Sequence, residues 1–164
     1  EVVTAADGRG RALLNDDFLE QSSVEGTPEH RAVEHLLKGV EIELPEGVSY
    51  TDKEGFRRYR SRIAWWLGPS SRSDLTIEEA VFPPQLVESS HRLGEMERSR
   101  LVGYDGAKPL FMGHYWLSGR PRPLTPKIAC LDYSVAAGGK LVAYTYRGET
   151  ELREEHFTSV PIRR

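Results

Sequence analysis

The sequence predicts an α+β fold, and three observations support this prediction. A helical period with clear end signals covers residues 28–38, a two-residue period follows from Val40, and short apolar runs separated by turn residues fill the last third. A chain of 164 residues and 18.5 kDa is long enough for one sizeable domain and too short for two independent cores. We therefore expect helices near the beginning of the chain and strands toward its end.

The helix over residues 28–38 has a start signal, a period and a stop signal. Thr27 is a suitable N-cap, Pro28 suits the first helical position, and Gly39 suits a left-handed C-terminal cap. Apolar residues recur between them at three- and four-residue spacing, namely Ala32, Val33, Leu36 and Leu37. A shorter helix is predicted around residues 17–20, capped by Asn15 or Asp16 and ended near Gly26.

The period changes to two residues after this helix, which is typical of strands. Val40, Ile42 and Leu44 alternate with two glutamates before Pro45 ends the strand. Residues 48–51, a turn at 52–55 and residues 56–66 then predict a β-hairpin. Residues 1–75 are therefore expected to form a helix and β-hairpin subdomain.

The rest of the chain divides into a connector and a strand-rich end. Residues 76–106 form the connector, with a helical turn expected at 76–80 and a helix, weakened by Gly94, at 85–101. Residues 107–164 carry apolar runs at 109–112, 127–135 and 140–146. Gly138 and Gly139 separate the last two runs and are placed for a tight turn between antiparallel strands.

Composition and charge exclude several classes of protein. The hydrophobic fraction is 38%, the charged fraction 29% and the mean hydropathy −0.50, so a packed core is expected and wholesale disorder is not. The net charge of −3 disfavours a nucleic-acid partner. No apolar run is long enough to cross a bilayer, and the single Cys130 fits a reducing, cytoplasmic compartment. Because the chain begins with Glu1 rather than Met, we expect a processed form or a piece of a longer protein.

His114 is the histidine whose position most favours chemistry. It follows Gly113 at the end of an apolar strand, where a turn can direct a side chain out of the sheet edge. The other histidines stand in polar or helical surroundings that favour solvated side chains. Asp132 interrupts a later apolar strand, so its carboxylate needs a partner. It is a candidate either to orient His114 or to hold the turn around Gly113.

A run of arginines and aromatics, FRRYRSRIAWW, covers residues 56–66. Arg58, Arg60 and Arg62 alternate along one face of the expected strand and form a candidate phosphate-binding face. The alternative is an amphipathic strand whose arginines are solvated or paired with Glu41 and Glu43 across the sheet. The acidic net charge favours this second interpretation.

Residues 108–146 resemble the C-terminal end of bacterial calcineurin-like metallophosphoesterases. The resemblance is carried by PLFMGHYWLSG, with its Gly-His at the end of a strand, and by KIACLDYSVAAGGKLVAY, with an aspartate, a Gly-Gly turn and Lys-Leu-Val-Ala. These enzymes are related to PPP-type serine/threonine phosphatases and symmetrical diadenosine tetraphosphatases. Residues 26–66 also resemble the middle of bacterial members. The resemblance implies an antiparallel-rich C-terminal sheet portion of a metallophosphoesterase-type sandwich, with residues 1–75 as a cap or insertion.

The resemblance also implies what the chain does and what it lacks. It implies hydrolysis of a phosphate ester or nucleoside polyphosphate by metal-bound hydroxide, with His114 as a ligand of Mn, Fe or Zn type ions. The family's Asp-x-His, Gly-Asp-x-x-Asp-Arg-Gly and Gly-Asn-His-[Glu/Asp] motifs do not occur in this sequence. Since one histidine cannot hold two ions, we expect the chain alone to be inactive. Its expected partners are a phosphorylated small molecule or phosphoprotein substrate and the missing N-terminal half.

Two other functions stay open at this point. A stand-alone domain could bind RNA or another polyanion through the arginine and aromatic hairpin. A structural remnant could instead associate with a second copy through an exposed sheet edge. Neither alternative needs a metal ion or a catalytic residue.

Overall fold

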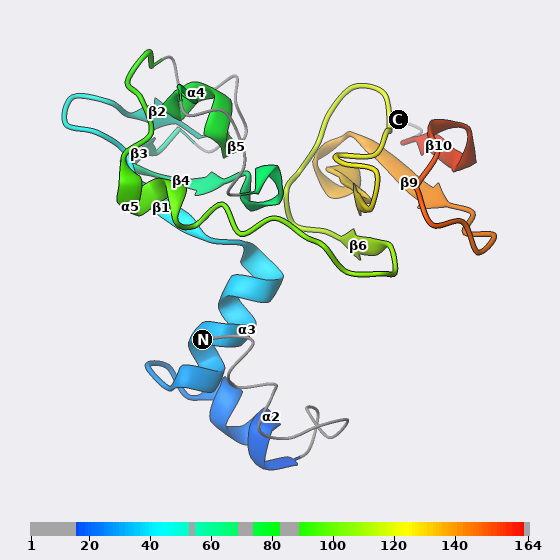
Figure 1. The fold of residues 1–164 in the computed structure, drawn as a ribbon, viewed down its shortest axis with the longest axis horizontal. Helices are drawn as coiled ribbons and strands as arrows, with labels where there is room; N and C mark the ends of the chain where they lie inside the picture. The colour runs from blue at the N-terminus through cyan, green and yellow to red at the C-terminus, as the bar shows by residue number, and fades with distance from the viewer. Residues whose placement is uncertain (1–15, 53–54, 69–73, 83–88, 163–164) are drawn as a thin grey trace. The chain divides into compact units, whose positions relative to one another are not determined.

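The computed structural model describes residues 16–52, 55–68, 74–82 and 89–162. Contacts divide the chain into two compact units, Glu1–Val40 and Glu41–Arg164, which are described separately below (Figure 1). The division predicted from the sequence into residues 1–75, 76–106 and 107–164 stays a prediction.

The first unit consists of two helices, α2 (Asp16–Ser23) and α3 (Pro28–Lys38). The predicted N-cap is confirmed, because the Thr27 side chain accepts a hydrogen bond from the His30 amide. Gly39 ends the helix as predicted, with a positive φ of 82°, but its ψ of 168° lies outside the left-handed helical region that was expected. Phe18 and Ala32 are buried. His30, expected to be solvated, instead places Nδ1 2.9 Å from the Ser22 carbonyl oxygen and so ties α3 to α2.

The first sheet of the second unit has the strand order β1-β4-β5, all antiparallel. It contains β1 (Glu41–Glu43), β4 (Arg60–Ile63) and β5 (Val81–Phe82). The register places Glu41 opposite Arg62 and Glu43 opposite Arg60. The predicted pairing of these glutamates and arginines across neighbouring strands is therefore confirmed at the level of register.

The continuous strand predicted over residues 56–66 is interrupted. Arg57–Arg58 (β3) pairs with Tyr50–Thr51 (β2), whereas β4 pairs with β1, so the chain changes partners at Tyr59. The Tyr59 carbonyl accepts a hydrogen bond from the Leu44 amide at 2.8 Å. Trp65–Leu67 then forms a 3₁₀ turn rather than extended strand.

The connector contains two helical turns. The turn expected at 76–80 is present as α4 (Ile77–Ala80), and Thr76 and Glu79 form a capping box at its start. The helix predicted over 85–101 is wrong within the described residues 89–94, which are not helical, and only α5 (Glu95–Arg98) forms. Gly94 precedes α5 in an extended conformation, as expected for a residue that weakens a helix interior. Residues 85–88 of that prediction lie outside the described residues.

The C-terminal strands form a parallel pair and an antiparallel sheet. β6 (Leu110–Met112) runs parallel to β7 (Ile128–Cys130), and the second sheet has the order β10-β9-β8. Its members are β8 (Asp132–Tyr133), β9 (Lys140–Tyr144) and β10 (Phe157–Pro161), of which the sequence pattern did not predict β10. The α+β class is confirmed, whereas the metallophosphoesterase-type sandwich stays a prediction.

An aromatic-rich core joins the strands on either side of the connector in the second unit. Its centre is the edge-to-face packing of Tyr115 against Trp66 at 4.9 Å and against Phe82 at 5.4 Å between ring centres. The Tyr115 hydroxyl donates a hydrogen bond to the Ile63 carbonyl at 3.3 Å, and burial raises the pKa of Tyr115. The buried members of this core are Ala64, Trp66, Tyr115, Leu117, Ile128, Cys130, Tyr133 and Val142.

The connection from β8 to β9 has no room for a side chain at Gly139. A Cβ there would lie 2.0 Å from the Tyr133 carbonyl oxygen, whereas one at Gly138 would contact nothing within 4 Å. Gly138 instead needs its positive φ of 85°.

Gly139→Ala should therefore lower the free energy of unfolding by at least about 3 kcal/mol. Gly138→Ala should cost only about 1 kcal/mol. Urea denaturation of both variants checks this order, and equal losses would contradict the described turn.

Candidate functional site

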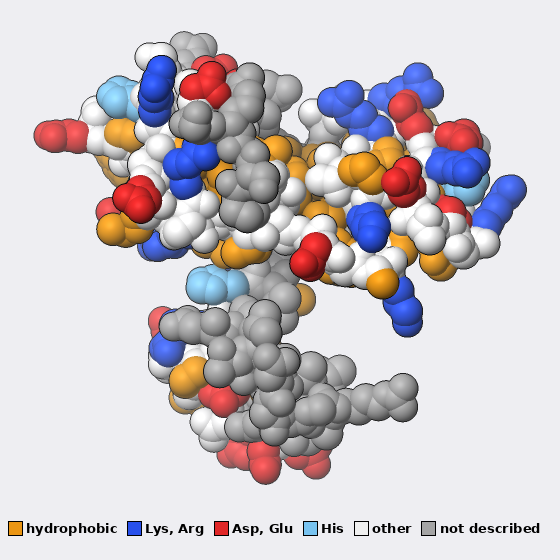
Figure 2. All heavy atoms as spheres, in the orientation of Figure 1, with side chains coloured by type: hydrophobic (Ala, Val, Ile, Leu, Met, Phe, Trp, Pro, Cys, Tyr) orange, Lys and Arg blue, Asp and Glu red, His pale blue; other side chains and the backbone are white. Residues whose placement is uncertain are grey.

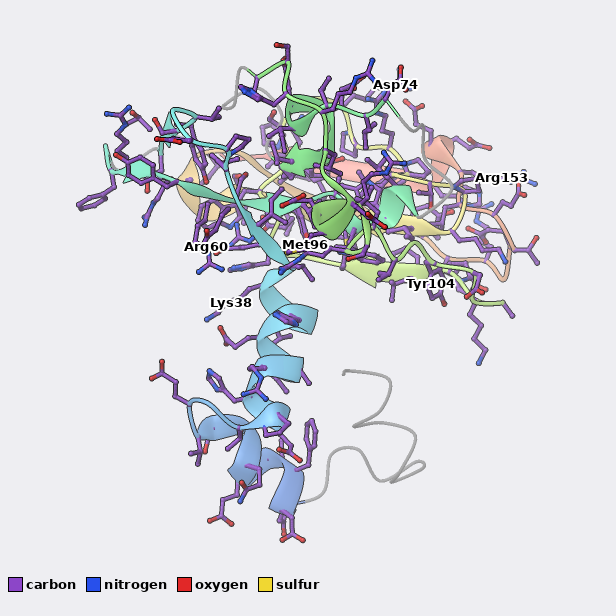
Figure 3. The ribbon with its side chains drawn as sticks, turned by 60° about the vertical axis from the view of Figure 1, so that its left-hand side comes forward. Lys38, Arg60, Asp74, Met96, Tyr104 and Arg153 are labelled. Atoms are coloured by element: carbon purple, nitrogen blue, oxygen red, sulfur yellow. The ribbon has the colours of Figure 1, made fainter. Side chains whose placement is uncertain are left out.

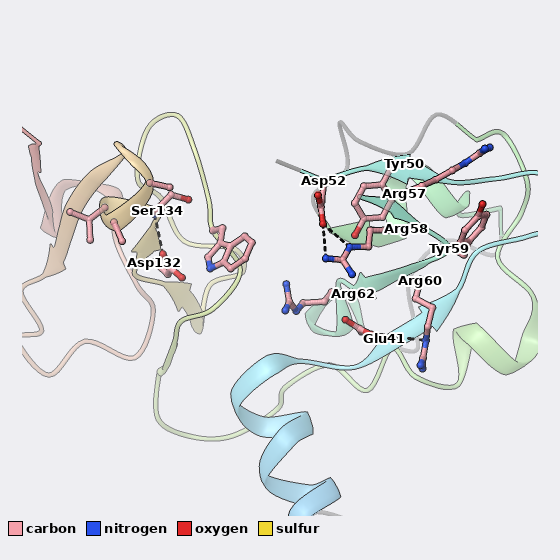
Figure 4. Close-up of a pocket in the computed structure, with 14 residues that line it drawn as sticks. Glu41, Tyr50, Asp52, Arg57, Arg58, Tyr59, Arg60, Arg62, Asp132 and Ser134 are labelled. Carbon is pink, nitrogen blue, oxygen red and sulfur yellow. Dashed lines mark hydrogen bonds and ion pairs between the residues drawn. The ribbon is translucent and has the colours of Figure 1, made fainter. Parts of the chain in front are cut away.

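A pocket of about 990 Å³ lies in the second unit between the arginine-bearing strands and the end of β8 (Figure 4). Among its described lining residues, four arginines stand against three carboxylates. The arginines are Arg57, Arg58, Arg60 and Arg62, and Asp132 and Ser134 lie on the opposite wall in the close-up. Tyr50, Tyr59 and Trp116 add aromatic surface. A concave site with several guanidinium groups and aromatic rings suits an anionic ligand.

Ion pairs join Asp52 and Glu41 of the pocket to Arg58 and Arg60, respectively. Asp52 accepts hydrogen bonds from the Arg58 guanidinium at 2.6 Å, which fixes Arg58 near the turn between β2 and β3. Arg60 lies 4.0 Å from Glu41 and both side chains are exposed, so this ion pair contributes little to stability. Two of the three predicted phosphate-binding residues thus differ, since Arg58 is closely paired with Asp52, whereas Arg60 can leave Glu41 at a small cost in free energy.

The predicted site residues His114 and Asp132 are in contact. The His114 backbone amide donates to Asp132 Oδ2 at 3.1 Å, and the Ser134 amide donates to Oδ1 at 2.9 Å. Asp132 therefore holds the backbone of His114, which lies just beyond β6. This agrees with a role in holding the turn beside Gly113. The 3.1 Å contact joins the Asp132 carboxylate to the backbone of His114.

Arg62, a member of the candidate phosphate-binding face, contacts His114. Its Nη2 lies 3.0 Å from His114 Nε2, across 52 positions of sequence. The guanidinium also lies over the Trp116 ring, 5.8 Å from the ring centre. Figure 4 shows Arg62 extending from β4 toward the wall that carries Asp132. Sequence analysis identified Arg62 and His114 separately, but it revealed neither their contact nor the place of Trp116, which is 51% exposed.

Backbone strain is concentrated around this pocket. Among the described residues, the non-glycine positions with positive φ are His114 at 68°, Trp116 at 47° and Ser134 at 59°. Trp116 and Ser134 line the pocket, and His114 contacts the lining residue Arg62. Each such conformation costs on the order of 1 kcal/mol, and residues of this kind cluster at functional sites. The Ser134 hydroxyl is also buried without a hydrogen-bond partner in the described part of the chain.

The described residues do not by themselves fit a metal ion. Within them, no three His, Cys, Asp or Glu side chains lie close enough together to hold one. His114 Nε2 already faces a guanidinium, and both oxygens of Asp132 accept backbone hydrogen bonds. The role of His114 as a metal ligand stays a prediction, and it would require further ligands from elsewhere.

Comparison with known proteins identifies no relative. No family model matches the chain, and no curated protein or solved structure is significantly similar to it. The described helices are all too short or too polar to cross a membrane. Basic and acidic side chains alternate over the face of the second unit visible in Figure 2. The assignment of function therefore depends on the pocket and on the sequence resemblance.

A second polar cluster closes the end of the β9–β10 hairpin. Glu149 accepts hydrogen bonds from the Tyr144 hydroxyl and the Arg147 amide, and the His156 ring nitrogen Nδ1 lies 2.9 Å from its carboxylate. Tyr144 in turn accepts from the Arg153 amide at 2.9 Å. Burial alone would raise the pKa of Glu149, but these hydrogen bonds outweigh it and lower the pKa to about 2. The cluster is structural, and His156 belongs to it rather than to the pocket.

This cluster makes stability depend on pH in the acid range. Because the pKa of Glu149 falls from 4.5 to about 2 on folding, the unfolded chain binds the proton more readily between these values. The stability that Glu149 contributes is present above about pH 4.5 and is lost as the pH falls toward 2. Urea midpoints measured across this range should decrease less steeply for Glu149→Gln than for the unchanged chain. Parallel curves would show that Glu149 is not held by these donors.

Proposed function

We propose that this chain is the C-terminal part of a metal-dependent phosphoesterase and that its own contribution is to bind the phosphate of the substrate. The observation that supports the proposal is the arginine-lined pocket, one of whose lining residues, Arg62, contacts His114, the residue singled out by the resemblance. The whole enzyme would hydrolyse a phosphate ester or a nucleoside polyphosphate in the cytoplasm. The chain alone would be inactive, because no three potential metal ligands lie together among its described residues.

The chemistry of the lining residues supports a phosphate ligand. A guanidinium presents N–H donors in a planar fork that matches two oxygens of a phosphate, and its charge persists at all physiological pH values. Arg60 lies at a weak ion pair with Glu41, so a phosphate can replace that partner. The volume of about 990 Å³ suits a phosphorylated small molecule better than an extended protein surface.

A second candidate function is supported by the outer end of the hairpin. Phe56 and Tyr59 are each 60% exposed, and the guanidinium groups of Arg58 and Arg57 lie 5.7 and 5.6 Å from the centres of their respective rings. Exposed aromatic rings interleaved with arginines can stack on bases and contact the backbone of single-stranded RNA. The net charge of −3 disfavours this candidate.

Phosphate binding can be tested with Arg60 and a distant control. Phenyl phosphate titrated into the chain should bind, and Arg60→Ala should weaken its affinity by about three- to tenfold, the loss expected for one exposed charge-assisted contact. Arg153→Ala removes the same charge well away from Arg60 (Figure 3) and should change the affinity by less than about twofold. Calorimetry provides the measurement.

The same samples separate the alternatives. We expect little bound metal by elemental analysis after Mn²⁺ loading and no hydrolysis of phenyl phosphate. Stoichiometric metal with turnover, both lost in His114→Ala, would show that the chain forms a working site and would contradict its inactivity. Tight, salt-sensitive binding of a single-stranded RNA oligomer without binding of phenyl phosphate would favour the second candidate and contradict the first.

A further inference from the structure

The contact between Arg62 and His114 fixes which atom donates the proton. A guanidinium carries only N–H donors and stays charged, so at 3.0 Å from Arg62 Nη2 the Nε2 atom of His114 must be the acceptor. His114 therefore acts on Arg62 as a hydrogen-bond acceptor that directs the guanidinium.

Trp116 restrains the same guanidinium from a second side. The Arg62 Cζ atom lies 5.8 Å from the centre of the Trp116 ring, and the rings of His114 and Trp116 meet edge to face at 5.9 Å. Two of the three strained backbone positions, His114 and Trp116, thus serve to place rings against Arg62. A guanidinium has five N–H donors, so it can contact an imidazole and an oxyanion together. Because its position is set in advance, less conformational entropy is lost when the anion binds.

The same arrangement disfavours a cation at His114. The Nε2 lone pair that a metal ion would use faces a permanent positive charge, and Arg62 would have to move before Nε2 could ligate a metal. The carboxylate oxygens of Asp132, which contacts the His114 backbone, both accept hydrogen bonds from backbone amides.

We infer that Arg62, positioned by His114 and Trp116, is the residue that binds the substrate's oxyanion, and that this binding requires no metal ion. The inference rests on the proposed function, since it takes the ligand to be a phosphate group. It assigns His114 in this chain to positioning Arg62 and Arg62 to direct contact with the phosphate oxygens. It also predicts that Arg62 contributes more to the phosphate affinity than Arg60 does.

Calorimetric titration with inorganic pyrophosphate in the presence of EDTA tests the inference. Binding should persist in EDTA, and Arg62→Ala should weaken it by about tenfold or more, the loss expected when a hydrogen-bonded charged contact is removed. His114→Gly accepts the positive φ of 68° without strain and removes the acceptor, so affinity should fall by about three- to tenfold. His114→Gln restores an acceptor oxygen and should recover most of this loss, which a merely structural role would not predict. Arg153→Ala is the charge-matched control.

The outcomes distinguish this inference from the proposed function. Near-UV circular dichroism identifies any variant that fails to fold, and Arg62→Lys, which keeps the charge but loses the planar fork, then replaces Arg62→Ala. Pyrophosphate binding that disappears in EDTA and returns with Mn²⁺, or that is unchanged in the Arg62 variants, would overturn the inference and leave phosphate binding intact. Absence of binding for both pyrophosphate and phenyl phosphate, with and without Mn²⁺, would overturn the proposed function itself.

Discussion

The packing of Tyr115 against Trp66 and Phe82 is the interaction on which the candidate site depends. Tyr115 follows His114, and Trp66 lies four positions after Arg62, so edge-to-face contacts at 4.9 and 5.4 Å bring two distant segments to one place. The hydrogen bond from the Tyr115 hydroxyl to the Ile63 carbonyl fixes the end of β4 against the same residue. Loss of this packing would separate Arg62 from His114 even though neither residue had changed.

The core also explains why strained backbone persists around the pocket. Tyr115 and Leu117 are buried on either side of Trp116, and Tyr133 is buried next to Ser134. These neighbours hold the chain while His114, Trp116 and Ser134 take positive φ values. The Asp132 carboxylate restrains the chain further, because it accepts hydrogen bonds from the backbone amides of His114 and Ser134. The rings around Arg62 are thus oriented by apolar burial and by the Asp132 carboxylate.

Residue periodicity and capping residues predicted the elements that depend on interactions between residues close together in the sequence. The α3 helix has the predicted bounds because Thr27 and Gly39 cap it. Alternation favoured pairing of the arginines with Glu41 and Glu43, but the Glu41–Arg62 register itself comes from the structure. The break at Tyr59 was missed because β3 and β4 have different partners, which the composition of a single strand does not encode. Arg62, His114 and Asp132 were recognised as candidates, but their arrangement depends on side chains that pack across 52 positions of sequence. No periodicity reports such a contact.

The most direct test is to locate a bound phosphate on the chain by ¹H–¹⁵N NMR titration with pyrophosphate in EDTA. The account predicts that the largest shifts occur at Arg62, His114 and Trp116, including the imidazole nitrogens, while the β9–β10 hairpin around Glu149 is unaffected. Shifts scattered over surface arginines and lysines, with none at His114, would contradict the claim that β4 and the end of β6 form one anion-binding site.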